Sequence, residues 1–316
     1  MNLSGVSDVI WSKCLQAKPG EKALVIADPH GERREIGEAL TEAGRKYCKC
    51  DLATMAPTGL NGREPPSEIA KKMLKYNIVL APLEYSITHT KAMKVLGEKG
   101  GRAATMPGIT KDIFLRAIPV DYEAITQTNA CLKEALENGK DLRLTTKTGT
   151  DITMQIAPNR KVSNCNGILK PGKITNLPDG EVAIAPKEGS SNGVIVFDLS
   201  SMGDDGNSVK LKKPFKAYVK DGLLVKCENR RLWETLSSVD NGTNLAELGI
   251  GTNPQARIIG EILEDEKVMG TAHIAFGTSA ELGGLVQTSV HEDSVLDKPT
   301  ISLDGKVIVK EGKILC

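Results

Sequence analysis

Aromatic side chains and net charge are both scarce in this sequence. Phe, Trp and Tyr together make up 3% of the residues, and the formal net charge at pH 7 is +1. Proteins that bind single-stranded nucleic acid stack its bases on aromatic rings, and proteins that bind duplexes or anionic membranes carry a clear excess of positive charge. We therefore expect neither a nucleic acid nor a membrane among the partners of this protein.

Long hydrophobic runs and a regular cysteine pattern are also missing. No apolar stretch reaches the roughly 18 residues that a transmembrane helix requires. The first eight residues lack the basic region and following apolar run of a signal peptide. The seven cysteines are odd in number and scattered along the chain, so they do not suggest a disulfide framework. These features together predict a cytoplasmic protein.

Strand and helix patterns alternate through the first third of the chain. Residues 22–27 and 77–82 are short apolar runs typical of buried strands, whereas residues 32–46 and 90–97 carry apolar side chains at helical spacing. Such alternation is typical of a mainly parallel sheet covered by helices. At 316 residues the chain has room for two domains, and we predict that the first, an α/β domain, spans residues 1–125.

The pattern changes after a last helix predicted at residues 122–138. Short strands are predicted at residues 141–146, 151–157, 193–199, 216–219, 223–227 and 307–310. Asp-Gly pairs, which favour hairpin turns, occur at 179–180, 221–222 and 304–305. We predict that residues 126–316 form a β-rich α+β domain, with a helix at about residues 253–263.

Histidines are few, and two of the four lie close together near the C-terminus. His273 is followed by the segment His291-Glu-Asp293. Residues two apart on a strand point to the same face, so His291 and Asp293 can act together. Imidazole nitrogens and carboxylate oxygens are ligands of catalytic metal ions. The spacing alone leaves open whether this is a metal site or a pair of structural histidines.

Two glutamates occupy apolar segments. Glu181 opens a run that follows the turn at residues 178–180, and Glu247 lies within residues 245–251. A carboxylate buried in such surroundings requires a cation or hydrogen-bond donors, although either residue could also face solvent on an edge strand. The acidic run at residues 264–266 is interpreted as a solvated turn, and His89 as a helix-entry residue that could alternatively bind a ligand.

These segments resemble the aminopeptidase T family of metallopeptidases. The resemblance rests on residues 181–186 with 193–198, 244–254, 264–277 and 291–293, and extends to residues 86–90 and 105–110. It covers most of the chain. The same superfamily includes the 2,5-dihydroxypyridine ring-cleaving dioxygenases, which are similar in length to this chain and use one Fe(II) ion.

The resemblance implies a metal-dependent aminopeptidase that hydrolyses N-terminal residues of peptides. It assigns the metal ligands as Glu181, Glu247, His273, His291 and Asp293. Glu181 would bridge two divalent ions (Zn, Co or Mn), and Glu181 or Glu247 would act as the catalytic proton shuttle for a metal-activated water. A homodimer is the family expectation.

The alternative implied function is an Fe(II)-dependent dioxygenase that acts on a dihydroxypyridine-like substrate. The larger aminopeptidases carry a catalytic tyrosine shortly after the first histidine ligand, and residues 278–282 of this chain contain none. A single ion held by histidine and carboxylate ligands with open positions is the arrangement of non-haem iron oxygenases. The sequence leaves both activities open. It also leaves open whether the substrate is a peptide or a small molecule.

Overall fold

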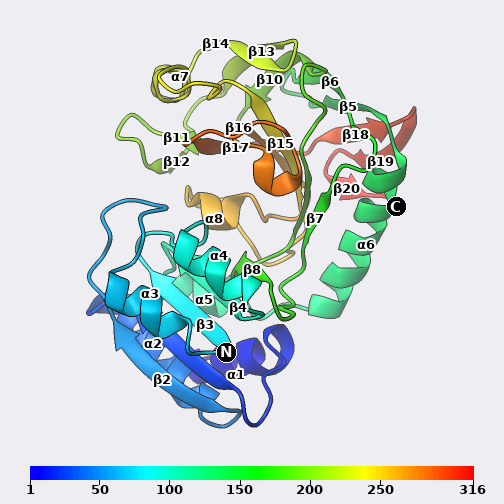
Figure 1. The fold of residues 1–316 in the computed structure, drawn as a ribbon. Coiled ribbons are helices and arrows are strands. Elements are labelled where there is room, and N and C mark those ends of the chain that lie inside the picture. The colour runs from blue at the N-terminus through cyan, green and yellow to red at the C-terminus, as the bar shows by residue number, and fades with distance from the viewer. The chain divides into compact units, whose positions relative to one another are not determined.

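The computed structural model describes residues 1–316, which divide into two compact units. The first comprises Met1–Tyr122 with Gly167–Asp179, and the second comprises Glu123–Asn166 with Gly180–Cys316. The class expected from the sequence is found: an α/β unit with a parallel sheet is followed by a β-rich unit (Figure 1). No helix is both long enough and apolar enough to cross a membrane.

The first unit is built on a five-stranded parallel sheet of order β2-β1-β3-β4-β8. Its strands are β1 (Lys22–Ala27), β2 (Lys49–Thr54), β3 (Ile78–Leu83), β4 (Arg102–Pro107) and β8 (Ile174–Asn176). Its helices are α1 (Leu3–Val9), the π-helical turn Ile10–Cys14, α2 (Gly31–Gly44), α3 (Ser67–Met73), α4 (Lys91–Glu98) and α5 (Lys111–Ala117). Every residue of β3 is buried, as expected for a central strand with helices on both faces.

A single boundary near residue 125 does not describe the division of the chain. Residues 167–179 return to the first unit, where β8 adds a parallel strand beside β4. Leu169 and Leu177 of this segment are buried in the core of that unit. A strand of three residues carries too little periodicity to be recognised, which explains why the sequence did not predict this return.

The second unit contains two antiparallel sheets. The eight-stranded sheet has the order β14-β13-β10-β6-β5-β18-β19-β20, and the seven-stranded sheet has the order β12-β11-β17-β16-β15-β9-β7. The first consists of β5 (Asp141–Thr145), β6 (Asp151–Gln155), β10 (Asn192–Phe197), β13 (Phe215–Lys220), β14 (Leu223–Cys227), β18 (Thr300–Leu303), β19 (Lys306–Lys310) and β20 (Lys313–Ile314). The second consists of β7 (Val162–Cys165), β9 (Glu181–Ile184), β11 (Ser200–Met202), β12 (Ser208–Lys210), β15 (Leu245–Gly251), β16 (Thr271–Gly277) and β17 (His291–Asp297).

Helices are few in this unit. They are α6 (Tyr122–Asn138), α7 (Arg230–Ser237), α8 (Ile262–Asp265) and a 3₁₀ turn at Ala280–Leu282.

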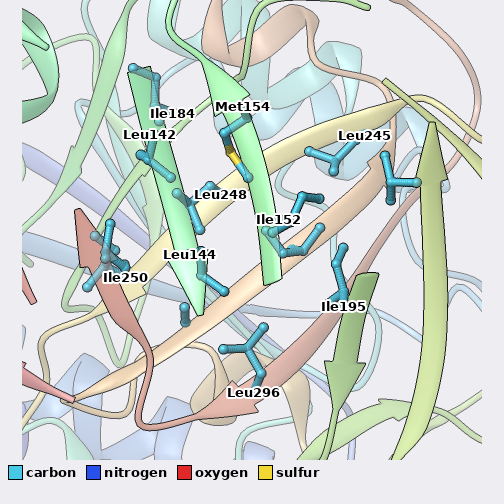
Figure 2. Close-up of a cluster of buried hydrophobic side chains, with 14 of the residues drawn as sticks. Leu142, Leu144, Ile152, Met154, Ile184, Ile195, Leu245, Leu248, Ile250 and Leu296 are labelled. Atoms are coloured by element: carbon cyan, nitrogen blue, oxygen red, sulfur yellow. The ribbon is translucent and has the colours of Figure 1, made fainter. Parts of the chain in front are cut away.

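The core of the second unit lies between its two sheets. Figure 2 shows side chains of β5 and β6, such as Leu144 and Ile152, directed toward Leu248 and Ile250 of β15. Because strand side chains alternate, Ile274 and Phe276 of β16 join this core, and His273 projects from the opposite face. The outer face of the seven-stranded sheet is therefore where the predicted metal ligands can meet.

Two of the three Asp-Gly pairs form the predicted hairpins. Asp221-Gly222 joins β13 to β14 and Asp304-Gly305 joins β18 to β19, all four residues having positive φ. The pair at 179–180 instead leads from β8 into β9, which belong to different sheets.

The helix predicted at residues 253–263 is wrong apart from the short α8. The side-chain oxygen of Asn253 accepts hydrogen bonds from the backbone N–H groups of Gln255 and Ala256, which holds a turn in place of a helix. One disulfide joins Cys131 of α6 to Cys316, with Cα atoms 5.7 Å apart, a pairing that the scattered cysteines did not predict.

Candidate metal centre

The five predicted ligands lie on four neighbouring strands of the seven-stranded sheet. Glu181 begins β9, Glu247 lies in β15, His273 lies in β16, and His291 and Asp293 lie in β17. Ala275 is opposite both Glu247 and Asp293, so these two side chains are on the same face of the sheet. The pairings of Glu181, His273 and His291 place their side chains on that face as well. All five side chains therefore project from the face turned away from the core.

A β-bulge brings Glu247 to that face. The pairing between β15 and β16 shifts between Leu245 and Glu247. Leu245 and Leu248 are both buried in the core between the sheets, although regular alternation would place them on opposite faces. The extra residue in the bulge resolves this conflict and leaves Glu247 pointing outward.

Short distances connect the members of the set. Nε2 of His273 lies 3.4 Å from Oε1 of Glu247 and 3.6 Å from Oε2 of Glu181. Nε2 of His291 lies 3.1 Å from Oε2 of Glu247 and 3.7 Å from Oδ2 of Asp293. Glu247 thus lies between the two imidazoles, with one carboxylate oxygen directed at each.

Gly249 makes the position of the His273 ring possible. This glycine is opposite His273 on one side of β15 and Ala183 of β9 on the other. A Cβ atom at residue 249 would overlap the ring atoms Cε1 and Nε2 of His273. The imidazole therefore lies over the bare backbone of β15, where it can reach Glu181 of the next strand.

Burial and the neighbouring charges shift the pKa values of these side chains in opposite directions. Burial opposes protonation of His273, but Glu247, Glu181 and Asp293 outweigh it and raise the pKa of this imidazole to about 9. Burial also opposes protonation of His291, but Asp293, Glu247 and the carbonyl of Thr278 outweigh it and raise the pKa of this imidazole well above its usual range. Burial works against ionisation of Glu247, yet hydrogen bonds from both imidazoles hold its pKa well below the usual range. Burial raises the pKa of Asp293.

This donor set fits a divalent cation. Two imidazole nitrogens and several carboxylate oxygens converge, and two three-residue combinations have ligand atoms within 4.8 Å of one another: Glu247, His291 and Asp293, and Glu266, His273 and Asp293. Oδ1 of Asp293 is buried without a hydrogen-bond partner. A buried carboxylate oxygen that lacks a partner is costly, and a metal ion is a partner of the right charge.

Two residues of the site were missed by the sequence interpretation: Glu266 and Lys267. Nζ of Lys267 lies 2.7 Å from Oε1 of Glu181 and 2.5 Å from Oε1 of Glu266. Burial raises the pKa of Glu266 to about 8, and the charge of Lys267 opposes that rise. The signal was present as an acidic run followed by lysine, but such runs are usually solvated.

The interpretation of residues 264–266 as a solvated turn is wrong. Glu264 and Asp265 are fully buried. Glu264 accepts a hydrogen bond of 2.7 Å from the backbone N–H of Arg257. Asp265 accepts two of 2.8 Å from the backbone N–H groups of Ile259 and Gly260, and another from the hydroxyl of Ser200. These carboxylates thus supply the hydrogen bonds that the loop at residues 257–260 would otherwise lack.

We expect Asp265→Asn to destabilise the second unit by about 1–3 kcal/mol. The amide keeps the size of the side chain but replaces one acceptor oxygen by a donor, which would face backbone N–H groups in a buried position. Denaturant unfolding followed by circular dichroism measures the effect. Asp204→Asn, at an exposed loop position, is the matched control. Equal stability of both variants would contradict the structural role of Asp265.

His89 lies in the first unit, exposed in the turn before α4. The next residue, Thr90, caps that helix by accepting a hydrogen bond from the backbone N–H of Met93. This position agrees with the interpretation of His89 as a helix-entry residue.

Comparison with known protein families identifies the family to which this chain belongs. The model of the NicX family, described as 2,5-dihydroxypyridine 5,6-dioxygenase, matches residues 14–316. The chain belongs to this family. A curated family relative, the 2,5-dihydroxypyridine 5,6-dioxygenase of Pseudomonas putida, is 23% identical over 229 residues. The matched region covers 65% of this chain and 62% of the relative.

Two solved structures share the fold of this NicX-family chain. The 2,5-dihydroxypyridine dioxygenase of Pseudomonas putida matches with a TM-score of 0.83 at 16% identity, over 99% of this chain and 97% of the other. Wild-type AmpT from Thermus thermophilus matches with a TM-score of 0.74 at 16% identity, over 100% and 99% of the two chains. The resemblance to aminopeptidase T is therefore one of fold, and the family model and the curated relative carry the dioxygenase name.

Proposed function

We propose that this protein is an Fe(II)-dependent ring-cleaving dioxygenase that acts on a dihydroxypyridine-like substrate. The observation that carries the proposal is membership of the NicX family over residues 14–316. The site supports it, because His273, His291 and Asp293 form a set of two imidazoles and one carboxylate on adjacent strands. That set is the ligand type of non-haem Fe(II) oxygenases.

Each residue has a distinct task in this proposal. His273, His291 and Asp293 hold the iron, whose open positions supply the oxygen chemistry of such enzymes. Glu247 faces Nε2 of both imidazoles, the atoms that would bind the ion, and is therefore a further candidate ligand. The His291 ring is oriented through its other nitrogen, Nδ1, which lies 2.9 Å from the carbonyl oxygen of Thr278. His291 is the more exposed of the two histidines, its side chain being 32% exposed against 1% for His273. We infer that the substrate approaches from the side of His291.

A metal-dependent aminopeptidase with two Zn, Co or Mn ions is the second candidate. It is favoured by the presence of both Glu181 and Glu247 on the ligand face, since two-ion hydrolytic sites need additional carboxylates. In that case Glu181 or Glu247 would transfer the proton of the attacking water. The family name and the lack of a tyrosine in residues 278–282 favour the dioxygenase.

Oxygen uptake by anaerobically purified protein tests the proposal. We expect the Fe(II)-loaded protein to consume oxygen with 2,5-dihydroxypyridine, and the ultraviolet absorbance of the ring to disappear at the same rate. The Zn(II)-loaded protein is expected to be inactive, because zinc has no redox chemistry. Cleavage of amino-acid amides by the Zn(II), Co(II) or Mn(II) form, with no oxygen uptake by the Fe(II) form, would contradict the dioxygenase proposal and support the aminopeptidase.

A further inference from the structure

The two histidines of the candidate metal centre are held in different ways. The ring of His273 is buried over Gly249, and its Nδ1 atom has no hydrogen-bond partner. The side chain of His291 is partly exposed, so packing alone does not fix its ring. Its Nδ1–H donates instead to the carbonyl oxygen of Thr278, at 2.9 Å. In a neutral imidazole this bond keeps the proton on Nδ1 and leaves Nε2 free to bind a metal ion.

The carbonyl that orients His291 belongs to a peptide group with a second hydrogen bond. The N–H of that group, from Ser279, donates to the carbonyl oxygen of Val286 at 2.9 Å. A peptide group is planar, so fixing its N–H also fixes the direction of its C=O. The hydroxyl of Thr278 donates to the same Val286 oxygen, at 3.3 Å. The position of Val286 therefore governs where the Thr278 carbonyl points.

Arg160 and Glu188 hold the backbone next to Val286. Oε1 of Glu188 accepts a hydrogen bond of 2.8 Å from the backbone N–H of Leu285, and its Oε2 lies 2.7 Å from Nη2 of Arg160. Nη1 of Arg160 donates to the carbonyl oxygen of Gly283. The Arg160 side chain is 4% exposed, so these charge-assisted hydrogen bonds are shielded from water. The two side chains thus bind each other and two backbone groups of the loop.

This ion pair lies across the sheet from His291. The loop at residues 278–290 joins β16 to β17, whereas Arg160 precedes β7 and Glu188 follows β9. In the sheet order β17-β16-β15-β9-β7, the loop therefore reaches past β15 to the opposite edge. Nζ of Lys161 adds a longer contact there, 3.4 Å from the carbonyl oxygen of Glu281. The loop is thus fixed against two strands that carry neither histidine.

We propose that Arg160 and Glu188 are positioning residues of the metal centre, which act on His291 through the loop at residues 278–290. The proposal rests on the proposed function only in taking His291 as a metal ligand, which both candidate functions share. Hydrogen bonds and peptide bonds connect the ion pair to the imidazole without a break. Loss of either charged side chain releases the loop, and the ring of His291 then loses the acceptor that keeps its Nε2 directed at the metal.

Nuclear magnetic resonance of the whole protein, labelled with ¹⁵N-histidine and loaded with Zn(II), tests the proposal without reference to catalysis. In the wild type we expect a slowly exchanging Nδ1–H proton on His291 and a metal-bound Nε2. In Arg160→Gln we expect that proton signal to be lost through exchange with water, while the signals of His273 stay unchanged. Fe(II) affinity, measured by anaerobic competition with a fluorescent chelator, should fall by about 10–100-fold.

Arg143→Gln is the matched control, because Arg143 pairs with Asp151 at the surface, where the two side chains are 56% and 55% exposed. It should keep the wild-type signals and affinity. Glu188→Gln is the second variant, since its amide offers one acceptor oxygen in place of two. We expect it to have the same effects as Arg160→Gln, and it decides the matter if Arg160→Gln does not fold.

An unchanged Nδ1–H signal and wild-type Fe(II) affinity in both variants would overturn the proposal, and so would a loss of stability alone. A wild-type His291 whose Nε2 does not bind zinc would overturn it together with the assignment of the metal site. Weaker metal binding by the variants, with no oxygen uptake by the wild type, would sink the dioxygenase and leave the positioning role standing. The failures of the two proposals are therefore distinguishable.

Discussion

His291→Ala should lower the affinity for Fe(II) by more than about 100-fold and abolish oxygen uptake. Loss of a residue that merely supports a metal ligand costs about 10–100-fold in affinity, and loss of a ligand should exceed that. His291 contributes an imidazole nitrogen 3.1 Å from Glu247 and 3.7 Å from Asp293. Of the proposed set of two imidazoles and one carboxylate, its removal leaves only His273 and Asp293, which bind Fe(II) more weakly.

Competition against a fluorescent metal chelator measures this affinity under anaerobic conditions. His30→Ala is the matched control, since His30 is an exposed residue before α2 in the first unit. The control should bind Fe(II) as the wild type does. The fold should survive in His291→Ala, because the histidine side chain is one-third exposed and leaves no enclosed cavity. Wild-type affinity in His291→Ala would exclude this residue from the metal site.

Gly249→Ala should weaken Fe(II) binding by about 10–100-fold, although residue 249 has no side chain to offer a metal. The new methyl group would overlap the His273 ring, so the ring must turn away from its place between Glu181 and Glu247. We also expect the free energy of unfolding to fall by about 1–3 kcal/mol, the usual cost of adding a methyl group to a packed interior.

Gly5→Ala provides the matched control for this change. A methyl group at residue 5 meets Cγ of Met1, whose exposed side chain can move aside. Alanine also favours the helix α1 over glycine, so the control should be slightly more stable than the wild type and bind Fe(II) equally well. A Gly249→Ala variant that binds Fe(II) with wild-type affinity would show that the His273 ring does not need this position.

Much of the fold follows from local patterns in the sequence. Residues 22–27 form β1, residues 122–138 form α6, and the Asp-Gly pairs at 221–222 and 304–305 form hairpins, all as predicted. These elements carry their own signal, either hydrophobic periodicity or a turn that requires positive φ. The helix predicted at residues 253–263 failed because the Asn253 side chain stabilises a competing turn.

The residues of the candidate site also fall into two groups, those that the sequence predicted and those that it did not. Glu181, Glu247, His273, His291 and Asp293 could be proposed from the sequence because their residue types and neighbouring segments resemble a known family. Glu266 and Lys267 could not, because an acidic run followed by lysine resembles an ordinary surface turn. Their burial depends on Glu264 and Asp265, which bind backbone N–H groups of residues 257–260.

The sequence by itself determined the class of the fold and the ligand types, since alternation along a strand assigns each side chain to one face of a sheet. Only the tertiary structure decided which charges meet there. The bulge in β15 brings Glu247 between the two imidazoles, Gly249 admits the His273 ring, and contact at Gly251 places Lys267 against Glu181. Each of these depends on a neighbouring strand or loop, because ion pairs and close backbone contacts form between segments that are distant in the chain.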